Sequence, residues 1–496
     1  MLQPFSPILD TIRDIFSPII DALLTYVPSE WVASLPALTL IAFGFLALFV
    51  GFRWNPLPVS VTGVILAGIE MVLIEASSSF GGLFIRDSFG DFFIWIILIV
   101  AVIVLMSSTI YGGNKGPYNF LLLLSFAGAI WVVMATDLIA LFLAWELMST
   151  PTYVLVALSP HRGAVDGATK YFVMGLLSST LIVFAIALVY GVTGYTDFTL
   201  VAGYIETIWA TGSTSAYAIL LSMILFLIGF GFKVGVFPGW MWVPDAYSTA
   251  DGSVTGYLAG ATKKTGVSAL LRILLVAFLI ARTEWIPVVV VISVLTMVIG
   301  NILALSQRNI MRMLAFSSIM MMGLLFVGVA AGTAFGASAV LFTAFAHALI
   351  KTGAFILVWA LAVSLGKEIT YDDLKGLGKR APMLAILLTI LIFALAGAPF
   401  TAGFWFKWLL IPGAAVAANL WWLAIIAVLN SVFALGYYLR VLRFCFFMEP
   451  SDDSKIQIPR IPLVAVILTV AGTILIGIFP GLVLEYAGAA ASVLIP

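Results

Sequence analysis

Long apolar segments recur along the whole chain, and they constrain its fold more than any other feature. An α-helix needs about 20 apolar residues to cross a lipid bilayer. Only 9% of the 496 residues are charged, against ~25% in an ordinary soluble domain. We therefore expect an all-α polytopic membrane protein with about 14 transmembrane helices. They are predicted at residues 36–52, 58–76, 92–110, 118–135, 137–158, 165–192, 217–238, 252–281, 285–305, 309–331, 335–364, 382–411, 420–447 and 461–487.

The connectors between these segments differ in their content of lysine and arginine. Odd-numbered connectors hold eleven such residues, whereas the even-numbered connectors and the amino-terminal segment hold three: Arg13, Arg86 and Arg282. Basic residues accumulate on the cytoplasmic side of membrane proteins. The asymmetry predicts a multi-pass protein of the cell (plasma) membrane with both termini outside.

Several charged residues lie inside segments that are otherwise apolar: Glu146, Lys170, Lys233, Lys263, Lys351 and Lys407. A lysine at the bilayer centre costs ~2.5–3.5 kcal/mol on insertion scales. Ionisable residues at this depth usually pair, face water, and mark an ion or proton path. We therefore expect these side chains to line a route for protons.

Two of the lysines lie in segments interrupted by glycine and proline. Lys233 lies in GFKVGVFPGW (231–240), and Lys407 lies in APFTAGFWFKW (398–408). Proline inside a helix frees a backbone carbonyl, and broken backbone is tolerated at membrane depth only inside protein or beside a watery cavity. Paired interrupted helices in two halves of a chain indicate the site of a transporter. We expect helices seven and twelve of the series to be broken.

The spacing of the lysines indicates an internal repeat. Lys233 and Lys407 are 174 residues apart, and Lys170 and Lys351 are 181 apart. Each pair is separated by five predicted helices, so the two units would have opposite topology; coincidence is the alternative. The predicted parts are an interfacial segment (1–35), helices 1–3 (36–117), two inverted five-helix repeats (118–284 and 285–447), and a cytoplasmic connector with helix 14 (448–496).

Each charged position also has a structural alternative. Glu146 is either a fixed partner for a lysine or the carboxylate that controls the proton affinity of that lysine, since a nearby negative charge favours the charged amine and desolvation favours the neutral one. Adjacent Lys263 and Lys264 point about 100° apart on a helix. One is expected to be a relay and the other a partner to an acid or a lipid head group, and the sequence does not choose between them. Lys170 follows Asp166 at i,i+4, which is also compatible with an ordinary ion pair near the helix end.

His347 and Lys351 are likewise spaced i,i+4 on one face of a long apolar helix. Histidine titrates near neutral pH and can pass protons, whereas a buried histidine bonded to a carbonyl is the alternative. The neighbouring lysine favours a proton path. Arg272 is a weaker candidate, expected to pair with Asp245 or Asp251.

The composition excludes several other classes of function. The single cysteine, Cys445, cannot hold an iron–sulfur cluster, and two histidines make a haem or zinc site very improbable. A net charge of zero suggests no nucleic-acid partner. We expect neither a metal nor a bound cofactor in this chain.

Five segments resemble the antiporter-like subunits of the complex I family, in order, across about residues 118–447. They are AWELMSTPTYVL (144–155), GFKVGVFPGWMWVPDAYSTA (231–250), Lys263, QRNIMRMLAFSS (307–318) and LAGAPFTAGFWFKW (395–408). Ala354 in TGAFI, YDDLKGLGKRAP (371–382) and YYLRVLRFCFFMEP (437–450) are similar to the N-type subunit. We also expect the chain to lack the lateral helix of the L-type subunit. His347 and Lys351 instead resemble the M-type and L-type pattern, and archaeal members driven by a reduced deazaflavin are similar here.

The resemblance implies a role for each matching residue. Glu146 would be the acid of helix five, Lys233 its partner in helix seven, Lys263 the central relay, and Lys407 the lysine nearer the exit. Flavin and iron–sulfur clusters would reside in partner subunits, and other membrane-arm subunits, including further antiporter-like subunits, would surround this chain together with lipids.

Three functions remain open at this point. The first is a proton-translocating subunit of an NADH:quinone oxidoreductase or a reduced-deazaflavin dehydrogenase (a translocase). The second is a subunit of a multisubunit sodium/proton antiporter without a redox module. The third is a structural membrane subunit.

Overall fold

The computed structural model describes residues 25, 27–75, 77–450 and 454–495. Within these ranges the secondary structure is helical except for a small antiparallel hairpin, β1 (Ser78–Ser79) and β2 (Phe84–Ile85). Most of the predicted interfacial segment (1–35) lies outside the described residues. Its last part is the 3₁₀-helix η2 (Ser29–Ser34), which continues directly into the first long helix.

The helices follow one another along the chain with short connectors. The first group is α2 (Leu35–Val50), α3 (Leu57–Leu73), α4 (Ser88–Ser107), α5 (Lys115–Met134), α6 (Leu138–Ala157) and α7 (Ala164–Thr193). The second is α8 (Phe198–Thr211), α9 (Ala216–Val234), α10 (Trp242–Thr249), α11 (Gly252–Tyr257) and α12 (Lys263–Arg272), with π-helical turns at η5 (Leu258–Thr262) and η6 (Ile273–Ala277). The third is α13 (Arg282–Ser306), α14 (Ile310–Ala330), α15 (Ala334–Leu365), α16 (Leu377–Arg380), α17 (Pro382–Ala396), α18 (Ala402–Trp408), η9 (Leu409–Val416), α19 (Trp421–Phe447), α20 (Arg460–Ile478) and α21 (Gly481–Ala491).

Eleven helices in the described part of the chain are long and apolar enough to cross a membrane, so the chain is a multi-pass membrane protein. The number of fourteen spans remains a prediction, because several of the corresponding helices are divided or shorter than a full span. The predicted span 58–76 is the 17-residue α3, and the span 461–487 is divided at Phe479 and Pro480 into α20 and α21. Pro480 explains that division, since a proline cannot continue the hydrogen bonding of a helix. Helix α8 was not predicted.

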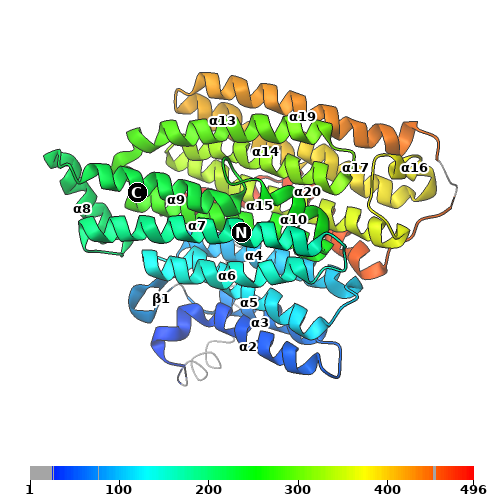
Figure 1. The fold of residues 1–496 in the computed structure, drawn as a ribbon, viewed down its shortest axis with the longest axis horizontal. Helices are drawn as coiled ribbons and strands as arrows, with labels where there is room; N and C mark the ends of the chain where they lie inside the picture. The colour runs from blue at the N-terminus through cyan, green and yellow to red at the C-terminus, as the bar shows by residue number, and fades with distance from the viewer. Residues whose placement is uncertain (1–24, 26, 76, 451–453, 496) are drawn as a thin grey trace.

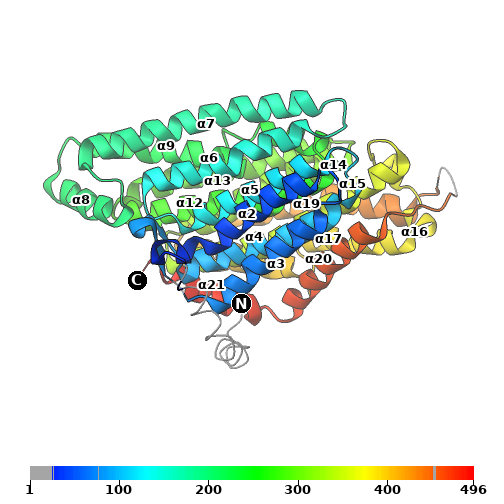
Figure 2. The same cartoon turned by 90° about the horizontal axis from the view of Figure 1, so that it is seen from below.

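The helices lie roughly side by side, as both views show (Figures 1 and 2). Helix α14 is buried except at Arg312, whereas α7 and α19 expose much of their apolar surface. Glycines allow the closest helix contacts. A Cβ on Gly300 of α13 would lie 2.5 Å from the Met320 nitrogen of α14, and a Cβ on Gly128 of α5 would lie 2.4 Å from the Met148 nitrogen of α6.

The odd-numbered and even-numbered connectors gather at opposite ends of the bundle. At one end His161 Nε2 lies 2.9 Å from Glu368 Oε1, and Lys379 donates to Glu449. At the other end residues 84 and 135, and 137 and 197, form backbone bridges. Both views place α8 at one end and α16 at the other (Figures 1 and 2). The connectors rich in basic residues therefore share one surface.

Candidate proton-transfer site

Both helices that were expected to be interrupted contain a break. Helix α9 ends at Val234 and α10 begins at Trp242, while α17 ends at Ala396 and α18 begins at Ala402. Gly235 (φ +76°) and Gly397 (φ +90°) end the first halves in left-handed conformations, which residues with a Cβ rarely adopt. Each break therefore depends on a glycine.

Each of these glycines lies against a lysine side chain. A Cβ on Gly235 would lie 3.1 Å from Lys263 Nζ, and a Cβ on Gly397 would lie 2.8 Å from Lys407 Cδ. Lys407 Nζ donates to the carbonyl oxygen of Ala396, 2.7 Å away, at the end of α17. The free carbonyls at the carboxyl end of a helix carry partial negative charge and stabilise a cation. The break thus leaves a backbone carbonyl free to accept a hydrogen bond from the half-buried Lys407 ammonium.

Lys233 lies in the last turn of α9 and is fully buried. Its Nζ donates to Thr152 Oγ1 (3.1 Å) and to the Tyr171 hydroxyl, and lies 5.3 Å and 4.8 Å from the ring centroids of Tyr153 and Tyr171. Hydroxyl oxygens and aromatic faces both favour an ammonium. Lys233 is therefore held by α6 and α7 without a carboxylate in contact.

Glu146 has a different partner in this structure. Ser179 of α7 donates to Glu146 Oε1 at 2.5 Å, and no ion pair within 4.0 Å joins Glu146 to Lys233. Glu146 is half-buried, facing α7. The two groups lie on neighbouring helices but are separate, so any influence of one on the other acts through space in a poorly screened environment.

The structure shows that Lys263 and Lys264 have different surroundings, and within the described residues neither forms an ion pair with an acid. Both are fully buried. Lys263 Nζ lies 3.3 Å from Ser318 Oγ and 5.2 Å from the ring centroid of Tyr247. Lys264 Nζ donates to the Ala259 carbonyl and lies 2.8 Å from His347 Nδ1. The two amines therefore point toward different neighbours, as their angular separation on a helix requires.

His347 and Lys351 extend this cluster along α15. Lys351 Nζ donates to the Leu314 carbonyl (2.9 Å) and to Ser317 Oγ (2.5 Å) of α14. His347 Nε2 is buried and has no hydrogen-bond partner among the described residues. When Lys264 donates to Nδ1, a neutral His347 carries its proton on Nε2. The imidazole thus has one nitrogen in contact with Lys264 and one nitrogen without a partner among the described residues.

Among the charged residues predicted at membrane depth, Lys170 is the exception. Its side chain is 60% exposed and pairs with Asp245 at 2.6 Å, not with Asp166. Asp245 also binds Arg312 at 2.7 Å. The alternative of an ordinary ion pair was the right one, with a different acid.

The expected partner of Arg272 was wrong. Arg272 binds Asp87 at 2.8 Å and the Val133 carbonyl, not Asp245 or Asp251. Twenty-one residues of nearly continuous helix separate Asp251 from Arg272, which is ~30 Å at 1.5 Å per residue. The two therefore lie near opposite ends of the bundle.

Sequence reasoning missed the neutral partners of the lysines: Thr152, Tyr153, Tyr171, Tyr247, Ser317 and Ser318. Polar residues within apolar helices could have indicated some of them, since Thr152 lies six residues after Glu146 and the two serines are adjacent. In the described ranges no group of three His, Cys, Asp or Glu side chains could hold a metal ion.

Comparison with known proteins decides the family. The family described as "NADH:quinone oxidoreductase/Mrp antiporter, TM" matches residues 135–434, more than half of the chain. This chain belongs to that family. Its resemblance to antiporter-like subunits of complex I is thereby confirmed.

Two relatives within this antiporter-like family cover almost the whole chain. NADH-quinone oxidoreductase subunit N of Trichlorobacter lovleyi is 36% identical over 438 residues, covering 86% of this chain and 89% of its own. F(420)H(2) dehydrogenase subunit N of Methanosarcina mazei is 33% identical over 490 residues, covering 93% and 98%. The fold is also similar to a chain of the membrane-bound sulfane sulfur reductase, an archaeal respiratory membrane complex, with a TM-score of 0.84, 24% identity, and coverage of 94% and 98%.

Proposed function

We propose that this chain is the N-type antiporter-like subunit of a membrane-bound electron-transfer complex and that it translocates protons. The names of the two relatives support this assignment, because both are N subunits of oxidoreductases. The observation that carries it is the Lys264–His347 contact, which joins α12 to α15 inside the bundle. Flavin and iron–sulfur clusters belong, in this proposal, to partner subunits of the complex.

The proposed cycle begins at Glu146 and Lys233. Redox energy released in other subunits changes the distance between the carboxylate and the amine. A close carboxylate favours the charged amine, and separation in a dry environment favours the neutral one. In this structure Glu146 and Lys233 are separate and each has hydroxyl partners. The hydroxyl and aromatic groups around Lys233 favour the ammonium, so we place this arrangement before Lys233 gives up its proton.

The proton then crosses the bundle through the buried amines. Lys263 follows Lys233, the Lys264–His347 pair connects α12 with α15, and Lys351 continues along α15. Lys407 is the last amine, on α18 beyond the second break. Ordered water bridges those groups that lie beyond hydrogen-bond reach, and charge on one amine disfavours charge on the next.

The two inverted repeats, 118–284 and 285–447, belong to the same proposal. The breaks after Gly235 and Gly397 occur in chain segments that cross the bundle in opposite directions, which supports opposite topologies. However, Lys233 precedes its break and Lys407 follows its break, so the two lysines are not equivalent positions. The common connector surface rich in basic residues supports a cytoplasmic location for it, with both termini outside.

Proton pumping and electron transfer, measured together on the purified complex in proteoliposomes, test this proposal. Lys233→Ala and Glu146→Ala should leave electron transfer measurable and reduce the protons moved per electron at least about tenfold, the loss expected for an essential proton-transfer group. Lys170→Ala is the matched control, because it removes a lysine of the same bundle that is exposed and paired at the surface. Full pumping by the Lys233 and Glu146 variants would reject the assignment.

A sodium/proton antiporter subunit is the second candidate, because the family description includes Mrp antiporters. The complex purified through this chain discriminates between the two. Copurifying flavin and iron–sulfur absorbance favours the oxidoreductase, and its absence from an intact complex favours the antiporter.

A further inference from the structure

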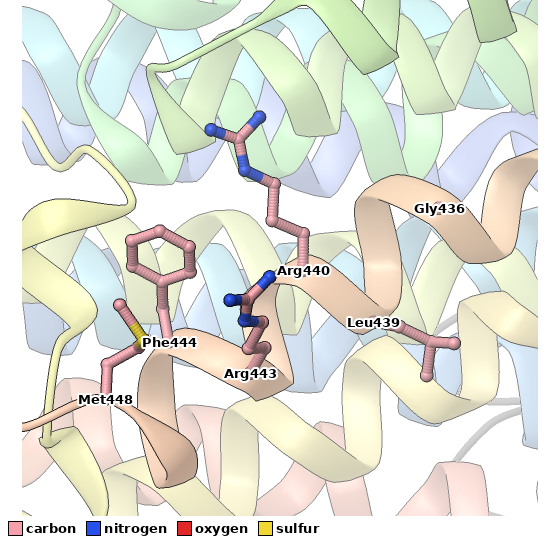
Figure 3. A pocket seen from close by; sticks show the side chains of 6 residues that line it. All are labelled: Gly436, Leu439, Arg440, Arg443, Phe444 and Met448. Atoms are coloured by element: carbon pink, nitrogen blue, oxygen red, sulfur yellow. The ribbon is translucent and has the colours of Figure 1, made fainter.

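A cavity of about 570 Å³ lies beside α19, away from the buried lysines. Its lining comes from the carboxyl-terminal half of that helix: Gly436, Leu439, Arg440, Arg443, Phe444 and Met448. Figure 3 shows the two arginines rising from neighbouring turns, with the Phe444 ring and the Met448 side chain beside Arg443. We call this cavity the α19 pocket.

The two guanidinium groups of the α19 pocket have no acidic partner in the part of the chain that the structure describes. Among the described residues, no carboxylate forms an ion pair with Arg440 or Arg443. Neighbouring basic residues are paired: Lys375 with Asp372 at 2.7 Å and Lys379 with Glu449 at 2.9 Å. Within the described residues the pocket therefore holds two arginines without an ion pair, whereas two nearby lysines are paired.

Aromatic contacts hold Arg440 in place without neutralising it. Its Cζ lies 4.1 Å from the ring centroid of Tyr371 and 5.9 Å from that of Phe444. A guanidinium stacked on a ring keeps its N–H edge available, and that edge matches phosphate oxygens in a bidentate geometry. Arg443, one turn further on, is exposed and adds a second donor group.

The lining residues of the pocket extend along α19 from its polar end toward its apolar part. From Met448 to Gly436 the helix spans twelve residues, or ~18 Å at 1.5 Å per residue, compared with ~15 Å for half of the hydrocarbon core. The arginines lie toward the end of α19, where Glu449 and Lys379 mark the polar connectors. Gly436 and Leu439 lie deeper, beside the exposed apolar residues Val432 and Phe433.

We propose that the α19 pocket binds an anionic phospholipid. Its phosphodiester accepts hydrogen bonds from Arg440 and Arg443, and one acyl chain packs along Leu439 and Gly436. A lipid of net negative charge, such as phosphatidylglycerol, compensates the two arginines, whereas zwitterionic phosphatidylcholine brings its own cation. The position of the pocket favours a lipid over free phosphate, because its lining continues from the arginines to Leu439 and Gly436 on the apolar part of the helix.

Lipid retention by the intact complex tests the proposal. The complex is purified in detergent, incubated with an equimolar mixture of phosphatidylglycerol and phosphatidylcholine, washed, and analysed by native mass spectrometry. The unmodified complex should retain phosphatidylglycerol preferentially. Arg443→Gln should weaken that retention roughly fivefold, the effect expected for one basic residue near an anionic lipid. Leu439→Gln should also weaken retention of the lipid, because it removes an apolar contact of the acyl chain without changing the charge of the pocket.

Matched controls distinguish a specific lipid site from general electrostatic attraction between basic residues and anionic lipids. Arg53→Gln removes an exposed arginine from another connector on the same surface and should leave retention unchanged. Equal retention of the two lipids, or equal losses in Arg443→Gln and Arg53→Gln, would overturn the proposal. Displacement of the lipid by millimolar inorganic phosphate would overturn it in favour of a free anion. Unchanged lipid with loss of a partner subunit from Arg443→Gln would overturn it in favour of a protein contact.

Discussion

Lys264 Nζ lies 2.8 Å from His347 Nδ1, and this contact connects the two halves of the chain within the buried core. The residues are 83 positions apart and come from α12 and α15. Among the groups proposed to carry the proton, this is the one direct contact between members on different helices in the described structure. It therefore determines which variants are most informative.

Removing the imidazole should interrupt proton transfer between the halves. His347→Leu leaves Lys264 with the Ala259 carbonyl alone and removes the nitrogen that exchanges protons. We expect pumping to fall at least about tenfold while electron transfer remains detectable, measured with a pH-sensitive dye in proteoliposomes. His347→Gln keeps a hydrogen-bond acceptor but cannot titrate, so it should assemble as well as the unmodified complex and still fail to pump. Normal pumping by His347→Gln would show that the imidazole is structural.

Adding a methyl group at the second break should disturb Lys407. In Gly397→Ala the new Cβ would lie 2.8 Å from Lys407 Cδ and take a positive φ, which costs ~1–2 kcal/mol. Gly366→Ala is the control, because Gly366 also has positive φ (+65°) but has no atom within 4 Å of the added group. Both variants should lose similar thermal stability from the backbone, and only Gly397→Ala should lose pumping. Equal proton pumping by the two variants would show that Lys407 is not part of the proton path.

Glycine at the crossing of α5 and α6 should be essential for stability. A Cβ on Gly128 would lie 2.4 Å from the Met148 nitrogen and 2.7 Å from the Leu147 carbonyl carbon, and backbone cannot move aside as a side chain can. Gly128→Ala should destabilise the subunit by ~1–3 kcal/mol, as overpacking does. Gly68→Ala, in α3 with no neighbour within 4 Å, should instead stabilise it by ~0.5–1 kcal/mol through helix propensity. Thermal unfolding of the detergent-solubilised complex measures both, and a stable Gly128→Ala variant would contradict this packing.

The connector between α15 and α16 should respond to pH through Asp373. Burial raises the pKa of this carboxyl, but hydrogen bonds from Lys367 and Thr370 outweigh burial and hold the pKa below its usual value. A carboxyl with a lowered pKa in the folded state contributes stability above its unfolded value of ~3.9, and this contribution disappears as the pH falls through the folded pKa. Asp373→Asn should therefore increase hydrogen exchange of residues 366–376 at pH 7.

At lower pH the hydrogen exchange of the unmodified protein and of Asp373→Asn should become similar. Below about pH 4 the stability contributed by the ionised carboxyl declines, and it is lost as the pH falls through the lowered folded pKa. The exchange of the unmodified chain, corrected for intrinsic rates, should therefore approach that of Asp373→Asn. A difference of the same size at pH 3 and pH 7 would contradict the role of the ionised carboxyl.

The sequence could predict those features that depend on neighbours along the chain. The lengths of apolar segments gave the helices, and glycine with proline in residues 235–239 and 397–399 gave the positions of the breaks. The spacing of His347 and Lys351 placed both on one face of a helix. Arg272 shows the limit, because its partner Asp87 is 185 residues away, and spacing along the chain carries no information on such a contact.

By itself, the sequence determined that this protein crosses a membrane, that two of its helices are broken, and that amines lie where lipid would exclude them. These properties follow from hydropathy and backbone stereochemistry, which act locally. Only the tertiary structure decided that Lys264 meets His347, that Tyr171 and Thr152 hold Lys233, and that Lys170 belongs to the surface. Such contacts depend on how each helix rotates and crosses its neighbours, and packing of the whole bundle sets that rotation.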